Sequence, residues 1–190
     1  MRATASGQSA LLLLDVIDML NRLRVPYAIV GAFAASFYGV VRASMDADAI
    51  ISLHPGQTGV TMLLDAFRAA GLKSAYRKGD LHDPVGAVIN AEDHLNNRVD
   101  LLMNIRGMTE AVFSRTIEAE FMKTRVRLIG VEDFVAMKIL AGGPTDLHDA
   151  AGVLHVSYDR IHLPLLNELV QAYGKDACRK LQTLLEGHRP

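Results

Sequence analysis

Apolar side chains recur at helical spacing near the start of the chain, at Leu12, Val16, Met19, Leu20 and Leu23. Acidic and polar residues occupy the positions between them, which is typical of an amphipathic helix. We therefore expect a helix over residues 9–24. Pro26 should end it, because the residue before a proline avoids helical backbone angles.

Beyond this helix, short apolar runs alternate with further helical patterns. The runs predict strands at residues 27–30, 46–53, 73–77, 86–90 and 98–103. The helical patterns predict helices at residues 32–38 and 58–70, the second opened by Pro55 and Gly56. We expect a turn at residues 78–84 and a strand or hairpin at residues 117–129.

From residue 131 onward the pattern is helical throughout. It predicts helices at residues 132–140, 146–156, 163–173 and 175–185. Strands mixed with helices, followed by helices alone, indicate an α/β (α+β) fold. We expect a mixed sheet flanked by helices over residues 1–130, and a C-terminal helical bundle over residues 131–190 packed on that core.

Composition narrows the class of protein. Hydrophobic residues make up 50% of the chain and charged residues 22%, which excludes a disordered chain. The formal net charge of -1 argues against broad nucleic-acid binding by charge alone. The single cysteine, Cys178, excludes an internal disulfide and a cysteine-based zinc site. The single cysteine suits a reducing cytoplasm, so we expect a cytoplasmic protein. An apolar run at residues 10–14 is too short to span a bilayer, so we expect no membrane partner.

Three aspartates on predicted strands are the main chemical signal. Asp46 and Asp48 lie two residues apart, so their side chains should share one face of a strand. Asp100 interrupts a second apolar strand. An Asp-x-Asp pair alone more often decorates a strand end, but the strand context and the third aspartate favour a site for a hard cation. Such a trio suits two metal ions, with Asp46 and Asp48 holding both, and Asp100 holding one and accepting a proton from the attacking hydroxyl.

The segment from Tyr27 to Asp48, which contains the glycines at 31 and 39 and the Asp-x-Asp pair, resembles the polymerase-β-like nucleotidyltransferase superfamily. More narrowly, it is similar to small bacterial nucleotidyltransferases that include AbiEii-type toxins. Two later segments fit the same resemblance: residues 98–102, around the third aspartate, and residues 131–141, where a helix carries one lysine. The resemblance covers roughly residues 25–149.

The resemblance implies a nucleotidyltransferase-type sheet, a nucleoside triphosphate as substrate, and Mg²⁺ as cofactor, with two ions expected and Mn²⁺ as an alternative. It also implies a set of phosphate-binding positions. Gly31 and Ala32 would bring backbone close to a phosphate, because glycine permits close approach. Arg42 would pair with phosphate oxygens, and Lys138 would reach the same anion.

Several positions depart from that pattern. Ala32 stands where a glycine or serine is usual, and no basic residue follows Lys138 before the next helix. We expect Asp146 and Asp149 to cap that helix. These departures leave two hypotheses. The first is an active enzyme that transfers a nucleotidyl group to RNA, a protein hydroxyl or a small molecule such as an aminoglycoside. The second is a degenerate module that binds a nucleotide or a protein partner, for instance in a toxin–antitoxin or phage-defence pair.

Overall fold

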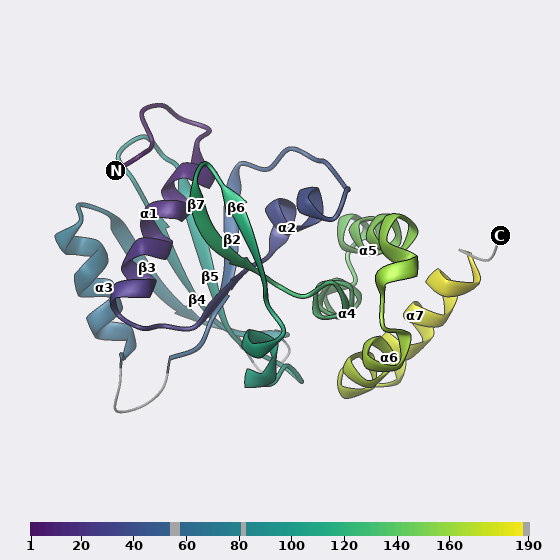
Figure 1. Ribbon diagram of the computed structural model, residues 1–190. Helices are drawn as coiled ribbons and strands as arrows, with labels where there is room; N and C mark the ends of the chain where they lie inside the picture. The colour runs from purple at the N-terminus through teal and green to yellow at the C-terminus, as the bar shows by residue number, and fades with distance from the viewer. Residues whose placement is uncertain (54–57, 81–82, 188–190) are drawn as a thin grey trace.

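A computed structural model describes residues 1–53, 58–80 and 83–187 (Figure 1). Pro55 and Gly56, the residues predicted to open the second helix, lie outside the described residues. Part of the turn predicted at residues 78–84 also lies outside them. The described chain forms one seven-stranded sheet with helices around it, in the strand order β3-β4-β5-β2-β1-β7-β6. The predicted mixed sheet with flanking helices and a C-terminal helical segment is therefore confirmed.

The strands follow the predicted runs closely. Their bounds are β1 Tyr27–Ile29, β2 Asp46–Ile51, β3 Lys73–Lys78, β4 Val85–Glu92, β5 Arg98–Ile105, β6 Ile117–Phe121 and β7 Thr124–Leu128. The sheet is mixed: β2 runs parallel to β5 and β1 parallel to β7, while the other neighbours are antiparallel. The region predicted as a strand or hairpin is a hairpin, β6–β7, whose two-residue turn has positive φ angles at Met122 and Lys123.

Three helices accompany the sheet: α1 Ser9–Arg22, α2 Gly31–Phe37 and α3 Val60–Ala69. Helix α1 packs on β2 and β5, α2 on β2, and α3 on β3. Helix α1 ends two residues before its predicted limit, and Arg24 turns the chain toward β1 with a φ of 54°. A short 3-10 helix, η1 Glu110–Ser114, follows β5 and was not predicted, because a single turn leaves no periodic pattern.

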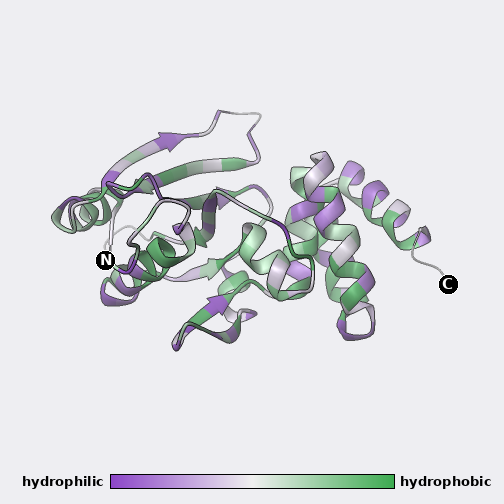
Figure 2. Ribbon diagram, turned by 90° about the horizontal axis from the view of Figure 1, so that it is seen from above, coloured by the Kyte–Doolittle hydropathy of each residue, from purple (hydrophilic) through white to green (hydrophobic). Residues whose placement is uncertain are grey.

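The remaining helices are α4 Val131–Ala141, α5 Pro144–Ser157, α6 Leu163–Ala172 and α7 Lys175–Glu186, with the 3-10 turn η2 Tyr158–Arg160 after α5. Figure 1 shows them grouped at one side of the molecule, beside the sheet. Figure 2 shows the same grouping from above, with hydrophilic and hydrophobic residues alternating along these helices. Helix α4 lies at the centre of the group, since it contacts α5, α6 and α7. The division of the chain at residue 130 stays a prediction.

No helix formed by the described residues has the length and apolar character that crossing a membrane requires.

Candidate active site

The Asp-x-Asp pair lies at the start of β2. Ala47 and Ala49, which alternate with the two aspartates, are 5% and 0% exposed. Because successive side chains of a strand point to opposite faces, Asp46 and Asp48 share the other face. Both are half-buried. The apolar end of β2, with Ile50 and Ile51, anchors this strand in the core and so fixes the position of both carboxylates.

Asp100 lies on the strand next to this pair. In the parallel register of β2 and β5, Asp48 is the partner of Asp100 and Asp46 is the partner of Arg98. Neighbouring strands are about 4.8 Å apart, so the Asp48 and Asp100 backbones are adjacent. The structure thus places the three aspartates at neighbouring positions of two strands.

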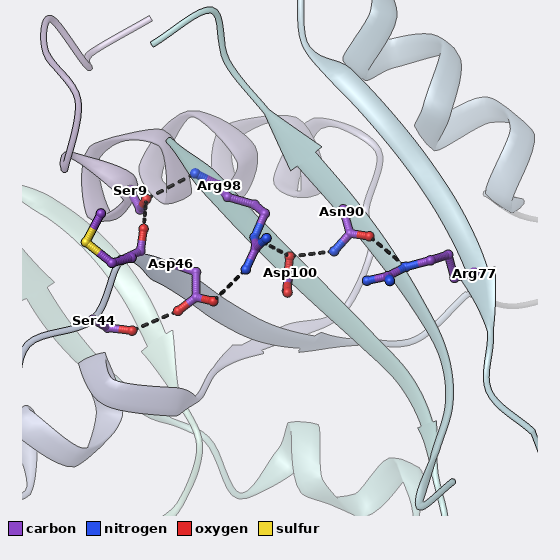
Figure 3. A network of polar contacts seen from close by, with 8 residues as sticks. Ser9, Ser44, Asp46, Arg77, Asn90, Arg98 and Asp100 are labelled. Carbon is purple, nitrogen blue, oxygen red and sulfur yellow. Dashed lines mark hydrogen bonds and ion pairs between the residues drawn. The ribbon is translucent and has the colours of Figure 1, made fainter. Parts of the chain in front are cut away.

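Arg98 bridges two of these carboxylates (Figure 3). A terminal nitrogen of its guanidinium donates to Oδ2 of Asp46 at 3.0 Å. Its Nε lies 3.5 Å from Oδ1 of Asp100. The Arg98 side chain is 49% exposed, so it reaches the carboxylates from the solvent side rather than from the core. A single positive charge therefore already lies among the three acidic side chains.

Further polar contacts hold this cluster in place, as Figure 3 shows. The side-chain amide of Asn90, on β4, donates to Oδ1 of Asp100 at 2.6 Å, and Nε of Arg77, on β3, donates to the side-chain Oδ1 of Asn90 at 3.1 Å. On the other side, the Ser44 hydroxyl donates to Oδ1 of Asp46 at 2.8 Å. Ser9 at the start of α1 accepts from the backbone N–H of Arg98 at 3.0 Å. Three elements, α1, β3 and β4, and the loop before β2 therefore orient the acidic cluster.

The acidic residues differ in their electrostatic state. Burial, followed by the neighbouring charges of Asp46 and Asp100, raises the pKa of Asp48 to about 6, although the charges of Lys138 and Arg42 act to lower it. For Asp46 the direction is opposite: the hydrogen bond from Ser44, followed by the pairing with Arg98, holds its pKa below the usual range. Among the described residues, Asp48 is the one of the three carboxylates that forms no ion pair.

Gly31 is the residue packed against Asp48. It begins α2 with a φ of 63°, a conformation that residues with a side chain rarely adopt. A Cβ atom at this position would lie 2.1 Å from Oδ2 of Asp48, well inside van der Waals contact. Glycine is therefore required here for two independent reasons, and the backbone between β1 and α2 approaches the carboxylate directly.

The two predicted phosphate-binding cations are paired with acidic residues. Lys138 of α4 is buried, and its Nζ lies 2.7 Å from Oδ1 of Asp146 and 2.9 Å from Oδ2 of Asp149. Arg42 donates through Nε to Asp149 at 3.2 Å. Asp149 is completely buried. It therefore joins α5 to α4 and to the segment that precedes β2.

This arrangement corrects the prediction that Asp146 and Asp149 cap a helix. Helix α5 begins at Pro144, and no side chain caps its N-terminus. Asp149 lies in the second turn of the helix and faces Lys138 instead. Local sequence does not separate the two cases, because a capping position and a buried ion pair both place an aspartate near a helix start. Only the packing of α5 on α4 distinguishes them.

A cavity of about 300 Å³ opens beside these groups. Gly31, Arg42, Asp46, Asp48 and Lys138 line it, so the structure brings five of the seven predicted site residues to one hollow. Its remaining wall is mainly apolar and comes from β4, β5 and α4. Ala32 lines a neighbouring cavity instead. Asp100 is linked to the other site residues by its ion pair with Arg98 and its hydrogen bond from Asn90.

The acidic cluster fits a divalent cation by its chemistry. Within the described ranges, no group of three or more histidine, cysteine, aspartate or glutamate side chains is arranged to hold a metal ion. Asp46, Asp48 and Asp100 nevertheless offer the oxygen ligands that Mg²⁺ prefers. A cation would also relieve the repulsion that raises the pKa of Asp48. Metal binding at these residues would require the Arg98 guanidinium to move.

Comparison with known proteins supports the fold. The sequence matches no family model and no curated protein. The structure is similar to the crystal structure of ANT(2″)-Ia in complex with adenylyl-2″-tobramycin, with 14% identity over 85% of this chain and 94% of the other, and a TM-score of 0.57. The solution structure of the antibiotic-resistance factor ANT(2″)-Ia gives 16% identity, 97% and 98% coverage, and a TM-score of 0.60.

A third similar structure is the lincosamide antibiotic adenylyltransferase LnuA with lincomycin bound. It shares 10% identity over 81% of this chain and 99% of the other, with a TM-score of 0.50. At such low identities the similarity shows the fold alone. The chain has a nucleotidyltransferase-like fold, as the sequence motifs predict.

Three residues of the site were missed by the sequence analysis, Arg98, Asn90 and Ser44, and the role predicted for Asp149 was wrong. Arg98 could have been predicted from the sequence, because it lies two residues before Asp100 on one strand and must therefore share its face. Asn90 could be found only from the register of β4 with β5, where it is the partner of Asp100. Asp149 required the packing of two helices, which local sequence does not specify.

Proposed function

We propose that this chain is a metal-dependent nucleotidyltransferase that moves a nucleoside monophosphate from a nucleoside triphosphate to a hydroxyl group of a small molecule. The observation that carries the proposal is the register of β2 and β5, which sets Asp48 beside Asp100 with Asp46 on the same face of β2. The similar structures add support, because they include an antibiotic adenylyltransferase and a complex with an adenylylated antibiotic.

The reaction forms one bond and breaks another at the α-phosphorus. The acceptor oxygen bonds to the α-phosphorus, the bond to the oxygen that bridges to the β-phosphorus breaks, and pyrophosphate leaves with the electron pair. We assign Asp100 as the group that accepts the hydroxyl proton, with Asn90 fixing its orientation. Mg²⁺, in two ions, or Mn²⁺ would be held by Asp46, Asp48 and Asp100, and would neutralise charge on the triphosphate.

The 300 Å³ cavity is the proposed nucleotide site. Its apolar wall, which includes Leu102, Ile105 and Met137, suits the base and sugar. Gly31 brings backbone directly against Asp48, and Arg42 and Lys138 supply positive charge in the same lining. Because Asp149 already pairs with both cations, triphosphate binding must share or displace these contacts.

That pairing also supports a second candidate, a module that binds a nucleotide or a protein partner without turnover. Two cations neutralised by buried or half-buried carboxylates attract a polyanion less strongly than free ones. Ala32 lacks the hydroxyl that a serine would offer. Kinship with AbiEii-type toxins, and a role in a toxin–antitoxin or phage-defence pair, stay predictions from the sequence motifs.

Transfer of radioactive label from α-³²P nucleoside triphosphates separates these candidates. Tobramycin, lincomycin, an RNA oligonucleotide and a carrier protein serve as acceptors, with Mg²⁺ or Mn²⁺. We expect metal-dependent labelling of a small molecule, reduced about 100-fold or more by Asp46→Asn or Asp48→Asn. Asp65→Asn, an exposed substitution on α3, is the matched control. Wild-type transfer by both site variants refutes the assignment, and nucleotide binding without metal or transfer favours the second candidate.

A further inference from the structure

Arg77, on the edge strand β3, is connected to the acidic cluster by two consecutive hydrogen bonds (Figure 3). Its Nε donates to Oδ1 of Asn90 at 3.1 Å, and Nδ2 of Asn90 donates to Oδ1 of Asp100 at 2.6 Å. Strand β4 lies between β3 and β5, which separates the backbones of Arg77 and Asp100 by about 10 Å or more. Contact between these two residues is therefore made through Asn90.

The three side chains lie on one face of the sheet. In the register, Asn90 is the partner of Ala75 on β3 and of Asp100 on β5. Register partners share a face, and Arg77 shares the face of Ala75 because it lies two residues further along the same strand. The two hydrogen bonds agree with this placement. Arg77 therefore faces the same side of the sheet as the candidate active site.

The chemistry of its two partners fixes the orientation of the Asn90 amide. A guanidinium has only donors, so the amide atom that faces Arg77 must be the oxygen. A carboxylate has only acceptors, so the amide atom that faces Asp100 must be the nitrogen. Half a turn of the amide would set two donors against each other at one end and two acceptors at the other. Arg77 and Asp100 therefore select the same orientation of Asn90.

The two oxygens of Asp100 have different partners. Oδ1 accepts the hydrogen bond from Asn90 and lies 3.5 Å from Nε of Arg98. Oδ2 forms no hydrogen bond or ion pair with the described residues. Asp46 shows a similar division, since its Oδ1 accepts from the Ser44 hydroxyl and its Oδ2 pairs with the exposed Arg98. In each carboxylate, a neutral side chain holds Oδ1 and leaves Oδ2 for a cation.

We propose that Arg77 is a positioning residue for the metal site, and that it acts through Asn90 on Asp100. The guanidinium fixes the Asn90 amide, the amide holds Oδ1 of Asp100, and Oδ2 stays available to a divalent cation. The proposal rests on the proposed function, because it assigns a residue that prepares a metal ligand of that reaction. Loss of a residue that hydrogen-bonds directly to a metal ligand typically weakens metal binding about 10–100-fold. Arg77 is exposed and one contact further away, so its effect should be smaller.

Charge and position predict opposite results when Arg77 is replaced. Loss of a positive charge near the site should tighten Mn²⁺ binding, because like charges repel. Loss of the contact with Asn90 should weaken it. Lys73 provides the matched control, since it lies four residues before Arg77 on the same strand and the same face. Its side chain is 81% exposed and pairs with Glu92 at 3.8 Å, not with Asn90.

Electron paramagnetic resonance of free Mn²⁺ measures the affinity of the full chain without a triphosphate. We expect Arg77→Met to weaken Mn²⁺ binding about fivefold, and Lys73→Met to leave it unchanged or slightly tighter. Asn90→Ala should weaken binding at least as much as Arg77→Met. In the Asn90→Ala background, Arg77→Met should cause no further weakening, because the contact through which it acts is already absent.

A nuclear magnetic resonance spectrum of the metal-free chain tests the geometry directly. The side-chain NH₂ signals of Asn90 are identified by their absence from Asn90→Ala. Arg77→Met should shift these signals, and Lys73→Met should leave them in place. Unchanged Asn90 signals in Arg77→Met, equal Mn²⁺ affinities of Arg77→Met and Lys73→Met, or tighter Mn²⁺ binding by Arg77→Met would overturn the proposal.

Transfer of label keeps the two proposals apart. If the wild type transfers label but Arg77→Met and Lys73→Met bind Mn²⁺ equally, the positioning role is wrong and the nucleotidyltransferase proposal stands. If no triphosphate is turned over but Arg77→Met alone weakens Mn²⁺ binding, the proposed function fails and the positioning role stands. A kcat that falls about fivefold in Arg77→Met, with an unchanged KM for the triphosphate, supports both.

Discussion

Arg98 and Asp46 are register partners on parallel strands, and the arginine donates a 3.0 Å hydrogen bond to the aspartate. The same guanidinium reaches Asp100, so it lies where a cation shared by these carboxylates would be expected. One positive charge cannot balance three carboxylates, and the raised pKa of Asp48 reflects its burial first and then the negative charges of Asp46 and Asp100. In the absence of metal, Arg98 therefore acts as a partial substitute for it.

Removal of this arginine should strengthen metal binding. Arg98→Gln deletes a competing cation whose exposed ion pairs contribute about 1 kcal/mol, so we expect Mn²⁺ to bind about fivefold more tightly. Electron paramagnetic resonance of free Mn²⁺ measures this without any enzyme assay. Arg68→Gln, which breaks an exposed pair with Asp65 on α3, should leave the affinity unchanged. Weaker Mn²⁺ binding in Arg98→Gln would contradict the competition.

Asp48 should make stability depend on pH. Its pKa in the folded chain is about 6, above the ordinary value of 3.8. The folded state therefore holds this proton more tightly than the unfolded state, and the stabilisation is complete below pH 3.8 and is lost as the pH rises through about 6. Asp48→Asn removes the charge, so it should raise the free energy of unfolding by about 2–3 kcal/mol at pH 8 and by almost nothing near pH 4.

Urea unfolding of metal-free protein between pH 4 and pH 8 measures this difference. Mg²⁺ should stabilise the wild type at pH 8 more than it stabilises Asp48→Asn, because only the wild type offers the charged ligand. If Asp48→Asn is less stable than the wild type at pH 8, the ionised carboxylate of Asp48 does not destabilise the folded state.

Asp149 should stabilise the C-terminal helices more than Asp146 does. Asp149→Asn leaves the buried Lys138 without its full countercharge, and breaking a buried pair in this way costs about 3 kcal/mol or more. Asp146→Asn should cost less than about 1 kcal/mol, because the Asp146 side chain is 30% exposed and Lys138 keeps Asp149. Thermal or urea unfolding of the two variants compares them, and equal losses would argue against the dominant role of Asp149.

Gly31 can be tested against a second glycine with the same backbone requirement. Gly31→Ala should cost about 2–4 kcal/mol, since it combines a left-handed backbone with a clash at Asp48. Gly71→Ala has a φ of 78° but no atom within 4 Å of the added methyl group, so it should cost only about 1–2 kcal/mol. Mn²⁺ affinity should fall in the first variant alone. Equal behaviour of the two variants would show that the contact with Asp48 is unimportant.

The sequence predicted most of the fold because its elements carry strong local signals. The spacing of Leu12, Val16 and Leu20 placed α1 to within two residues of its end, and glycines or prolines mark many of the boundaries. The hairpin at residues 117–128 stayed ambiguous, since alternation alone does not reveal where a strand reverses. The two-residue turn at Met122 and Lys123 lacks the usual glycine or asparagine.

The candidate site was predictable in part because the periodicity of a strand is also a local signal. The period of a strand fixes that Asp46 and Asp48 share a face, which needs no knowledge of the rest of the molecule. The pairing of Lys138 with Asp149 could not be predicted, because it depends on how α5 packs against α4. The position of Arg98 over Asp46 depends on the register of two strands that are 52 residues apart in the chain.

The most direct test of the central claim is a crystal structure with Mn²⁺ and a non-hydrolysable ATP analogue, read by anomalous scattering. We expect anomalous peaks among the carboxylates of Asp46, Asp48 and Asp100, the triphosphate beside Gly31, and the Arg98 guanidinium turned away from Asp46. A triphosphate bound with no ion at these carboxylates, or an ion at Asp46 and Asp48 with Asp100 out of reach, would contradict the account.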